Sequence, residues 1–83
     1  MKVKINDSIE ITFNELQIKY LSILISQSQQ NLSIENKDDI IKNKNEIKLL
    51  LDSRKCYVSM YGYQWKDEKE ILTELQKIFS LIF

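Results

Sequence analysis

The sequence predicts a small α+β domain in which an N-terminal β-hairpin and one further strand form a sheet, with three to four helices packed on one face. Three observations predict this class. Apolar and polar residues alternate near the N-terminus, apolar residues recur at helical spacing in 14–26 and 67–82, and strand-forming aromatics crowd 56–65. Because 83 residues is the length of one domain, we expect 1–83 to fold as a single unit.

The first predicted element is the hairpin. Val3 and Ile5 alternate with lysines, and Ile9 and Ile11 alternate with polar residues, as in half-buried strands. A three-residue loop at 6–8 would pair Ile5 with Ile9 and Val3 with Ile11, which keeps one apolar face. A two-residue turn would mix the two faces, so we predict the three-residue loop.

A strongly apolar helix should follow the hairpin. Asn14 is a good N-cap, and Gln17 stands at the position that completes a capping box. Beyond this start, apolar side chains cover more than half of the helical wheel, which is typical of a central helix. We expect the helix to end where polar residues run from Gln27 to Asn31.

Residues 33–54 are open to two interpretations. Ser33 or Asn36 could cap a helix, which the polar run at 43–45 could split into two short helices. Alternatively, residues 47–51 could form a strand, because a short apolar run has no decisive period. We favour the helix.

Residues 56–65 are predicted to form the third strand, because this segment is rich in tyrosine, valine and tryptophan. In such a strand Cys56, Val58 and Met60 would face the helices, and Cys56 would be a buried, unreactive thiol. A final helix should begin near Asp67, where acidic side chains suit the positive end of the helix dipole. Its apolar stripe consists of Ile71, Leu72, Leu75, Ile78, Phe79 and Ile82.

Composition and charge exclude several classes of function. The 12 basic and 12 acidic side chains cancel, whereas a nucleic-acid-binding protein usually carries a basic excess. Histidine is absent and glycine occurs once, which excludes histidine-based catalysis and a glycine-rich phosphate loop. A single cysteine and the lack of a long apolar run predict a cytoplasmic protein with no membrane segment.

One short pattern resembles the metal-binding core of a large nuclease superfamily. Asp38 or Asp39 is followed by Glu46 and Lys48, and in that superfamily two carboxylates hold Mg²⁺ while the lysine positions water. The geometry needs Glu46 and Lys48 on a strand, so that both project the same way. Chance in a chain rich in glutamate and lysine is the better explanation, so we predict no catalytic residue, metal or cofactor.

Two segments resemble the response-regulator family of winged-helix DNA-binding domains. Residues 9–16 match its entry from strand to helix, and residues 57–65 loosely match its C-terminal wing. The resemblance implies a recognition helix in 45–55 and phosphate contacts by its basic residues. These candidate nucleic-acid contacts are Lys48, Arg54 and Lys55.

The aromatic segment provides the best indication of a binding surface. If the predicted strand turns one face outward, Tyr57, Tyr61, Tyr63 and Trp65 lie on it, and tyrosine and tryptophan are favoured at protein interfaces. The opposite orientation, with these rings beneath the helices, is equally compatible with the sequence. Leu81 and Phe83, beside or off the stripe of the last helix, are further candidate contacts.

We therefore expect a non-enzymatic protein-binding module. It would be a small inhibitor or regulator, of the anti-defence type that phages and mobile elements carry, which blocks a site on a host protein. Abundant isoleucine, lysine and asparagine, with no alanine or proline, indicate the AT-rich genome on which this origin rests. The partner would be a host or self-encoded protein, a homodimer is compatible with the sequence, and a DNA-binding winged-helix regulator is the alternative.

Overall fold

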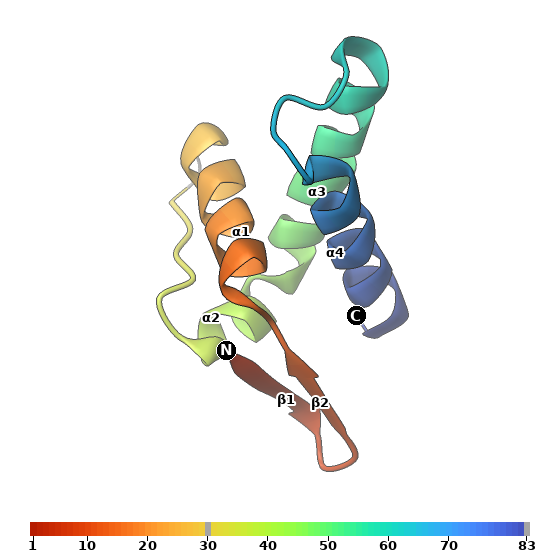
Figure 1. The fold of residues 1–83 in the computed structure, drawn as a ribbon. Coiled ribbons are helices and arrows are strands. Elements are labelled where there is room, and N and C mark those ends of the chain that lie inside the picture. Colours follow the sequence, from red (N-terminus) through yellow and green to blue (C-terminus); the bar gives the residue numbers. More distant parts are fainter. Residues whose placement is uncertain (30, 83) are drawn as a thin grey trace.

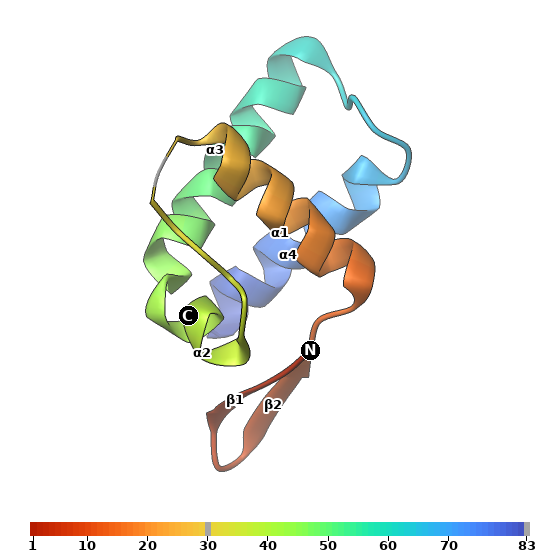
Figure 2. The ribbon, with the colours of Figure 1, turned by 90° about the vertical axis from the view of Figure 1, so that its left-hand side faces the viewer.

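The structure is a computed structural model that describes residues 1–29 and 31–82, without the side chain of residue 82. Within that part of the chain it contains a two-stranded antiparallel sheet and four helices (Figure 1). The elements are β1 (Lys2–Asn6), β2 (Ile9–Thr12), α1 (Glu15–Gln27), α2 (Lys37–Lys42), α3 (Lys44–Tyr61) and α4 (Glu68–Ile82). The hairpin projects from one end of the helices, as the turned view also shows (Figure 2).

The hairpin forms as predicted, but its loop is shorter. Val3 pairs with Ile11 as expected, whereas Asn6 instead of Ile5 pairs with Ile9, because the register shifts between Lys4 and Asn6. The Asn6 side chain explains the shorter loop, since its Oδ1 accepts a 2.8 Å hydrogen bond from the backbone of Ser8. The extra residue in β1 is a bulge, which keeps Val3 fully buried.

The predicted start of α1 is confirmed at atomic detail. The backbone N–H of Gln17 donates to Asn14 Oδ1 at 2.8 Å, and the backbone N–H of Asn14 donates to Gln17 Oε1 at 2.9 Å. This reciprocal pair is a capping box, which satisfies backbone donors that the first helical turn leaves free. The helix ends at Gln27, where the polar run begins.

The ambiguous middle segment is helical and divided. Asn36 caps α2 through a second capping box with Asp39. Asn43 separates α2 from α3, and residues 47–51 lie within α3. The favoured interpretation of this segment is therefore confirmed, including the division at its polar run.

The predicted third strand is wrong, because residues 56–61 continue α3 as a helix and 62–67 form a loop. A buried stripe of helical spacing begins at Ile47, before this segment, and it carries the helix through the first part of the aromatic segment. The stripe consists of Ile47, Leu51, Arg54 and Val58. The predicted burial of Cys56 and Met60 is also wrong, since both lie on the exposed side of α3 and only Val58 faces inward.

The core lies between α1, α3 and α4 and extends to the base of the hairpin. Phe13 joins the hairpin to the bundle, because its ring lies 6.1 Å from that of Phe79 on α4. The stripe predicted for the last helix is confirmed where its side chains are described, since Leu72, Leu75 and Phe79 are buried. No helix in the described ranges has the length and apolar character needed to cross a membrane.

Candidate binding surface

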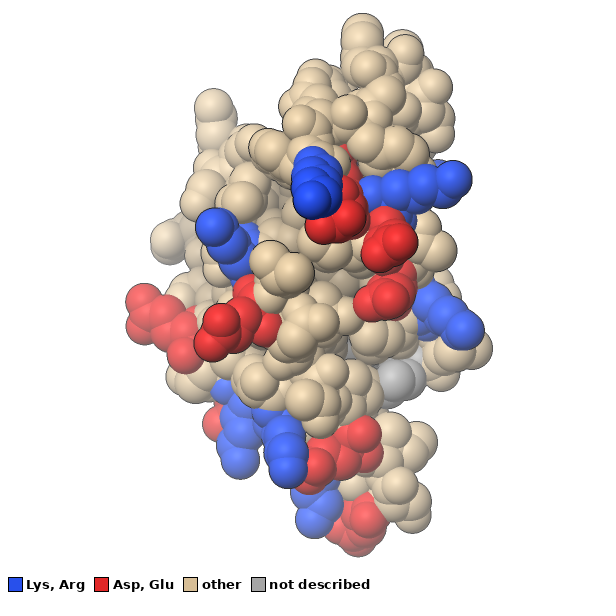
Figure 3. Space-filling model, in the orientation of Figure 1, with Lys and Arg blue, Asp and Glu red and all other residues tan. Residues whose placement is uncertain are grey.

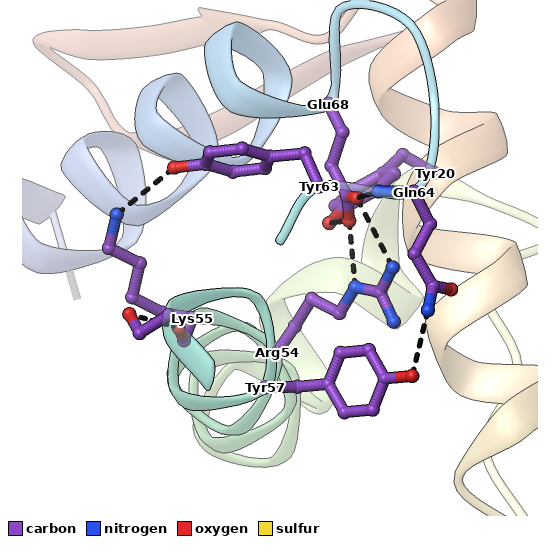
Figure 4. Close-up of polar contacts among 8 residues, drawn as sticks. Tyr20, Arg54, Lys55, Tyr57, Tyr63, Gln64 and Glu68 are labelled. Atoms are coloured by element: carbon purple, nitrogen blue, oxygen red, sulfur yellow. Dashed lines mark hydrogen bonds and ion pairs between the residues drawn. The ribbon is translucent and has the colours of Figure 1, made fainter. Parts of the chain in front are cut away.

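A buried ion pair organises the end of the molecule where α3 meets the loop to α4 (Figure 4). Arg54 lies in the inward stripe of α3, and Glu68 is the first residue of α4. Arg54 Nε lies 2.7 Å from Glu68 Oε2, and Arg54 Nη2 donates to Oε1 at 3.2 Å, so the contact is bidentate. The Glu68 side chain is fully buried, and the pair therefore sits away from solvent.

Two further donors complete the coordination of the Glu68 carboxylate. The Tyr20 hydroxyl on α1 donates to Oε2 at 2.5 Å, and the backbone N–H of Gln64 in the loop donates to Oε1 at 2.9 Å. Burial alone would raise the pKa of Glu68, but the bonds from Arg54, Tyr20 and Gln64 outweigh it and hold that pKa below its ordinary value. The carboxylate is thus charged and fully satisfied, and it ties α1, α3 and the loop together.

The pKa values of the other two members of this cluster, Tyr20 and Arg54, are both raised. Burial, followed by the hydrogen bond to Glu68, raises the pKa of Tyr20, so its hydroxyl remains a donor at neutral pH. The hydrogen bond to Glu68 raises the pKa of Arg54, although burial opposes this. At neutral pH the cluster therefore contains one cation, one anion and one neutral phenol.

Aromatic rings enclose the guanidinium. The Arg54 Cζ atom lies 4.8 Å from the centre of the Tyr57 ring and 4.6 Å from the centre of the Trp65 ring. Both distances suit a cation–π interaction. Trp65 also meets Tyr20 edge to face, with ring centres 5.8 Å apart. Trp65 is thus held on two sides.

The loop of residues 62–67 is fixed by side chains from α3. The Gln64 side-chain amide donates to the Tyr57 hydroxyl at 2.7 Å, and Lys55 Nζ donates to the Tyr63 hydroxyl at 3.3 Å. Figure 4 shows these two contacts on opposite sides of the ion pair. Gly62 begins the loop with φ of +86° and ψ of 166°, a conformation that a side chain would strain.

The exposed large side chains at the end of α3 and the start of this loop form what we call the aromatic surface. Its members are Tyr57, Met60, Tyr61 and Tyr63. Met60 and Tyr61 are the most exposed, at 74% and 68%, and the Tyr61 ring lies 4.9 Å from that of Tyr57. Figure 3 shows that this end of the molecule presents no charged side chain at its tip on the face in view.

The predicted partner-binding residues are divided between two ends of the structure. The tyrosines at 57, 61 and 63 gather with Trp65 around the loop, where all four are partly or largely exposed. Leu81 is 74% exposed, but it lies near the end of α4, which points toward the hairpin end (Figure 1). The predicted contact at Phe83 lies outside the described residues.

The residues proposed for nucleic-acid binding are not equivalent. Arg54 is buried and committed to Glu68, whereas Lys55 is exposed and contacts Tyr63. Lys48 is half-buried on α3. The segment that resembled a wing is the end of α3 and a loop, so the strand expected there is absent.

The arrangement that resembled a nuclease core is also different from the expected one. Glu46 and Lys48 both lie on α3, where residues two positions apart project to nearly opposite sides. Across residues 1–29 and 31–82, no group of three or more acidic, cysteine or histidine side chains is placed to hold a metal ion. The strand geometry that the pattern requires is therefore not present.

The sequence interpretation missed the central ion pair, although a signal was present. Arg54 occupies a position that an apolar residue would take in the stripe between Leu51 and Val58. A lone arginine at such a position needs a buried partner of opposite charge. The predicted helix extended only to residue 54 and a strand was expected from residue 56, which concealed the continuous stripe and hence the pair.

Comparisons with known protein families, curated proteins and solved structures found no match to this chain.

Proposed function

We propose that this chain is a non-enzymatic protein-binding module and that the aromatic surface is its main contact. The observation that carries the proposal is the exposure of Met60 and Tyr61 at the end of α3, where the face drawn in Figure 3 carries no charged side chain at its tip. Aromatic and methionine side chains are enriched at protein interfaces, and a few of them usually provide most of the binding energy. Its biological role is that of a small inhibitor or regulator that blocks a site on another protein.

The rigidity of this surface supports the proposal. Tyr57 is held by Arg54 and Gln64, and Tyr63 is held by Lys55. Side chains that are already ordered lose little conformational entropy when a partner binds. A contact surface built on a buried ion pair is thus prepared for binding before the partner arrives.

Balanced charge favours a protein partner over nucleic acid. The chain carries no net charge, and its one arginine is buried in an ion pair. Affinity for phosphate would have to come from exposed lysines, and binding to DNA would then weaken steeply with salt. A contact dominated by aromatic burial should depend little on salt.

The test is affinity capture from a lysate of the cells in which the chain occurs, treated with nuclease, followed by binding measurements with the purified partner. We expect Tyr61→Ala to weaken binding by about 2 kcal/mol or more, as for a central interface residue. Leu49→Ala is the matched control, because Leu49 is an equally exposed apolar residue at the other end of α3. It should bind like the wild type.

Two outcomes would contradict this proposal. One is a partner that binds Tyr61→Ala and Met60→Ala as tightly as the wild type while both variants remain folded. The other is loss of every captured partner after nuclease treatment, which would favour the DNA-binding alternative. Neutralising Lys48 and Lys55 would then reduce retention on DNA.

A further inference from the structure

A groove separates α1 from the start of α4, on a part of the surface that does not include Met60 or Tyr61. It has a volume of about 340 Å³ and is lined mainly by apolar side chains. Leu16 and Ile23 from α1 form one wall, and Ile71 and Trp65 form the other. Leu16 is 59% exposed, so this apolar wall is open to solvent.

The charged side chains of this groove that have no ion-pair partner among the described residues are of one sign. Lys19 and Lys66 line it, and within the described part of the chain neither forms an ion pair or a side-chain hydrogen bond. Glu68 also lines it, but its charge is satisfied by the ion pair with Arg54. The groove therefore offers a partner two uncompensated positive charges beside an apolar wall.

The groove is also held open by the ion-pair cluster. Trp65 is fixed between Arg54 and Tyr20, and the Tyr20 hydroxyl is bound to Glu68. Because the same contacts that organise the loop set the position of Trp65, the wall exists without a ligand. Such preformed apolar clefts with a few placed polar groups are typical of binding sites.

We propose that this groove binds an acidic, apolar segment of a partner protein. One or two large apolar side chains of the segment enter between Leu16 and Trp65, and its carboxylates lie beside Lys19 and Lys66. Charge complementarity determines this choice of occupant, since a basic segment would be repelled. The proposal goes beyond the function assigned to the aromatic surface, because it requires neither Met60 nor Tyr61.

The test is a selection of displayed random dodecapeptides on the full chain, followed by titration with the enriched synthetic peptides. Trp65 is the only tryptophan, so its fluorescence reports on the groove directly. We expect enriched peptides to combine large apolar residues with aspartate or glutamate and to change Trp65 fluorescence. Their affinity should fall about tenfold or more in Lys19→Glu/Lys66→Glu and in Leu16→Ser, the former by charge repulsion.

We expect these variants to fold, because the substituted side chains are exposed or at the groove rim. Circular dichroism checks that they do. Met60→Ala/Tyr61→Ala is the matched control and should bind the peptides like the wild type. If it loses them instead, the peptides occupy the aromatic surface and the groove proposal is wrong. Failure of the groove proposal thus leaves the protein-binding proposal intact, and the reverse also holds.

Three other results would overturn the inference. The first is the absence of any enriched peptide, and the second is enrichment of basic peptides or of peptides that Lys19→Glu/Lys66→Glu binds equally well. The third is concentration-dependent self-association of the wild type, measured by sedimentation velocity, that changes Trp65 fluorescence. In that case the occupant is a second copy of the chain.

Discussion

At the scale of single residues, Glu68 connects the fold to both surfaces. Each of its carboxylate oxygens accepts two hydrogen bonds, and no buried polar side-chain atom among the described residues lacks a partner. A buried charge is tolerated only when it is paired and hydrogen-bonded in this way. Since Arg54 and Tyr20 also position Trp65, loss of the pair should disturb the loop as well as the core.

Removing one partner should therefore cost more than removing the whole polar cluster. Arg54→Met leaves a buried carboxylate without its cation, and we expect it to lower the free energy of unfolding by ~3–5 kcal/mol. The triple variant Tyr20→Phe/Arg54→Met/Glu68→Met replaces all three polar groups with apolar ones and should lose less. Urea unfolding measures the free energy of unfolding of both variants. A triple variant less stable than Arg54→Met would contradict this account.

The ion pair also predicts how stability depends on pH. The pKa of Glu68 is lowered in the folded protein, so the folded state binds this proton more weakly than the unfolded chain. The contribution of the carboxylate is complete above the ordinary glutamate pKa of about 4.3 and is lost as the pH falls through the folded-state value. The free energy of unfolding should thus fall on acidification below about pH 5.

Variants of two neighbouring acids isolate this effect. Glu68→Gln should show a shallower loss of unfolding free energy with acidification than the wild type, because the titrating group is gone. Glu70, an exposed acid in the same helical turn, is the matched control, and Glu70→Gln should keep the wild-type slope. Equal slopes in wild type and Glu68→Gln would contradict the assignment of the lowered pKa to this cluster.

At the scale of elements, residues with strong local chemistry were predictable. Asn14 and Asn36 are short polar side chains placed before apolar periodicity. Asn14 caps α1 as expected, and Asn36, one of the two caps considered for the next helix, caps α2. The hairpin was predicted from the alternation of apolar and polar residues, and the last helix from apolar residues at helical spacing. Their physical causes lie within a few neighbouring residues, which is what sequence reasoning can evaluate.

The aromatic segment was not predictable in the same way. Tyrosine, valine and tryptophan favour strands by local preference, yet packing of the α3 stripe against the core overrides that preference. The tyrosines are exposed, which agrees with the outward of the two orientations considered. However, they lie on the end of a helix and on a loop, and not on the predicted strand. The groove beside α1 could not be predicted, because it depends on how α1 meets the loop of residues 62–67.

The single glycine determines where α3 ends. Gly62 combines a φ of +86° with a ψ of 166°, a region almost restricted to glycine. An added Cβ would meet no atom within 4 Å, so the cost of a side chain is backbone strain alone. We expect Gly62→Ala to lower the free energy of unfolding by ~1–3 kcal/mol.

Urea unfolding of Gly62→Ala beside Ser80→Ala checks this expectation. Ser80 is exposed within α4, so alanine there should change stability little. Gly62→Ala that is as stable as Ser80→Ala would show that the end of α3 can be formed without the strained conformation.

At the scale of the whole molecule, the two ends have different character. The hairpin projects at one end, and the end of α3 lies at the other (Figures 1 and 2). The aromatic surface lies at that end of α3, and the groove is lined by residues of α1, of the loop and of α4. The overall charge is balanced, so long-range steering toward a charged partner is weak. Recognition should depend on local shape and on contacts at the aromatic tip.

The most direct test of the central claim uses the methyl resonances of the two methionines in this sequence. Met60 lies in the aromatic surface and Met1 lies at the hairpin end, so one reports on the proposed contact and the other serves as an internal reference. With ¹³C-methyl-methionine protein and the purified partner, we predict that Met60 shifts or broadens while Met1 is unchanged. A bound complex in which Met60 is unperturbed would contradict binding through the aromatic surface.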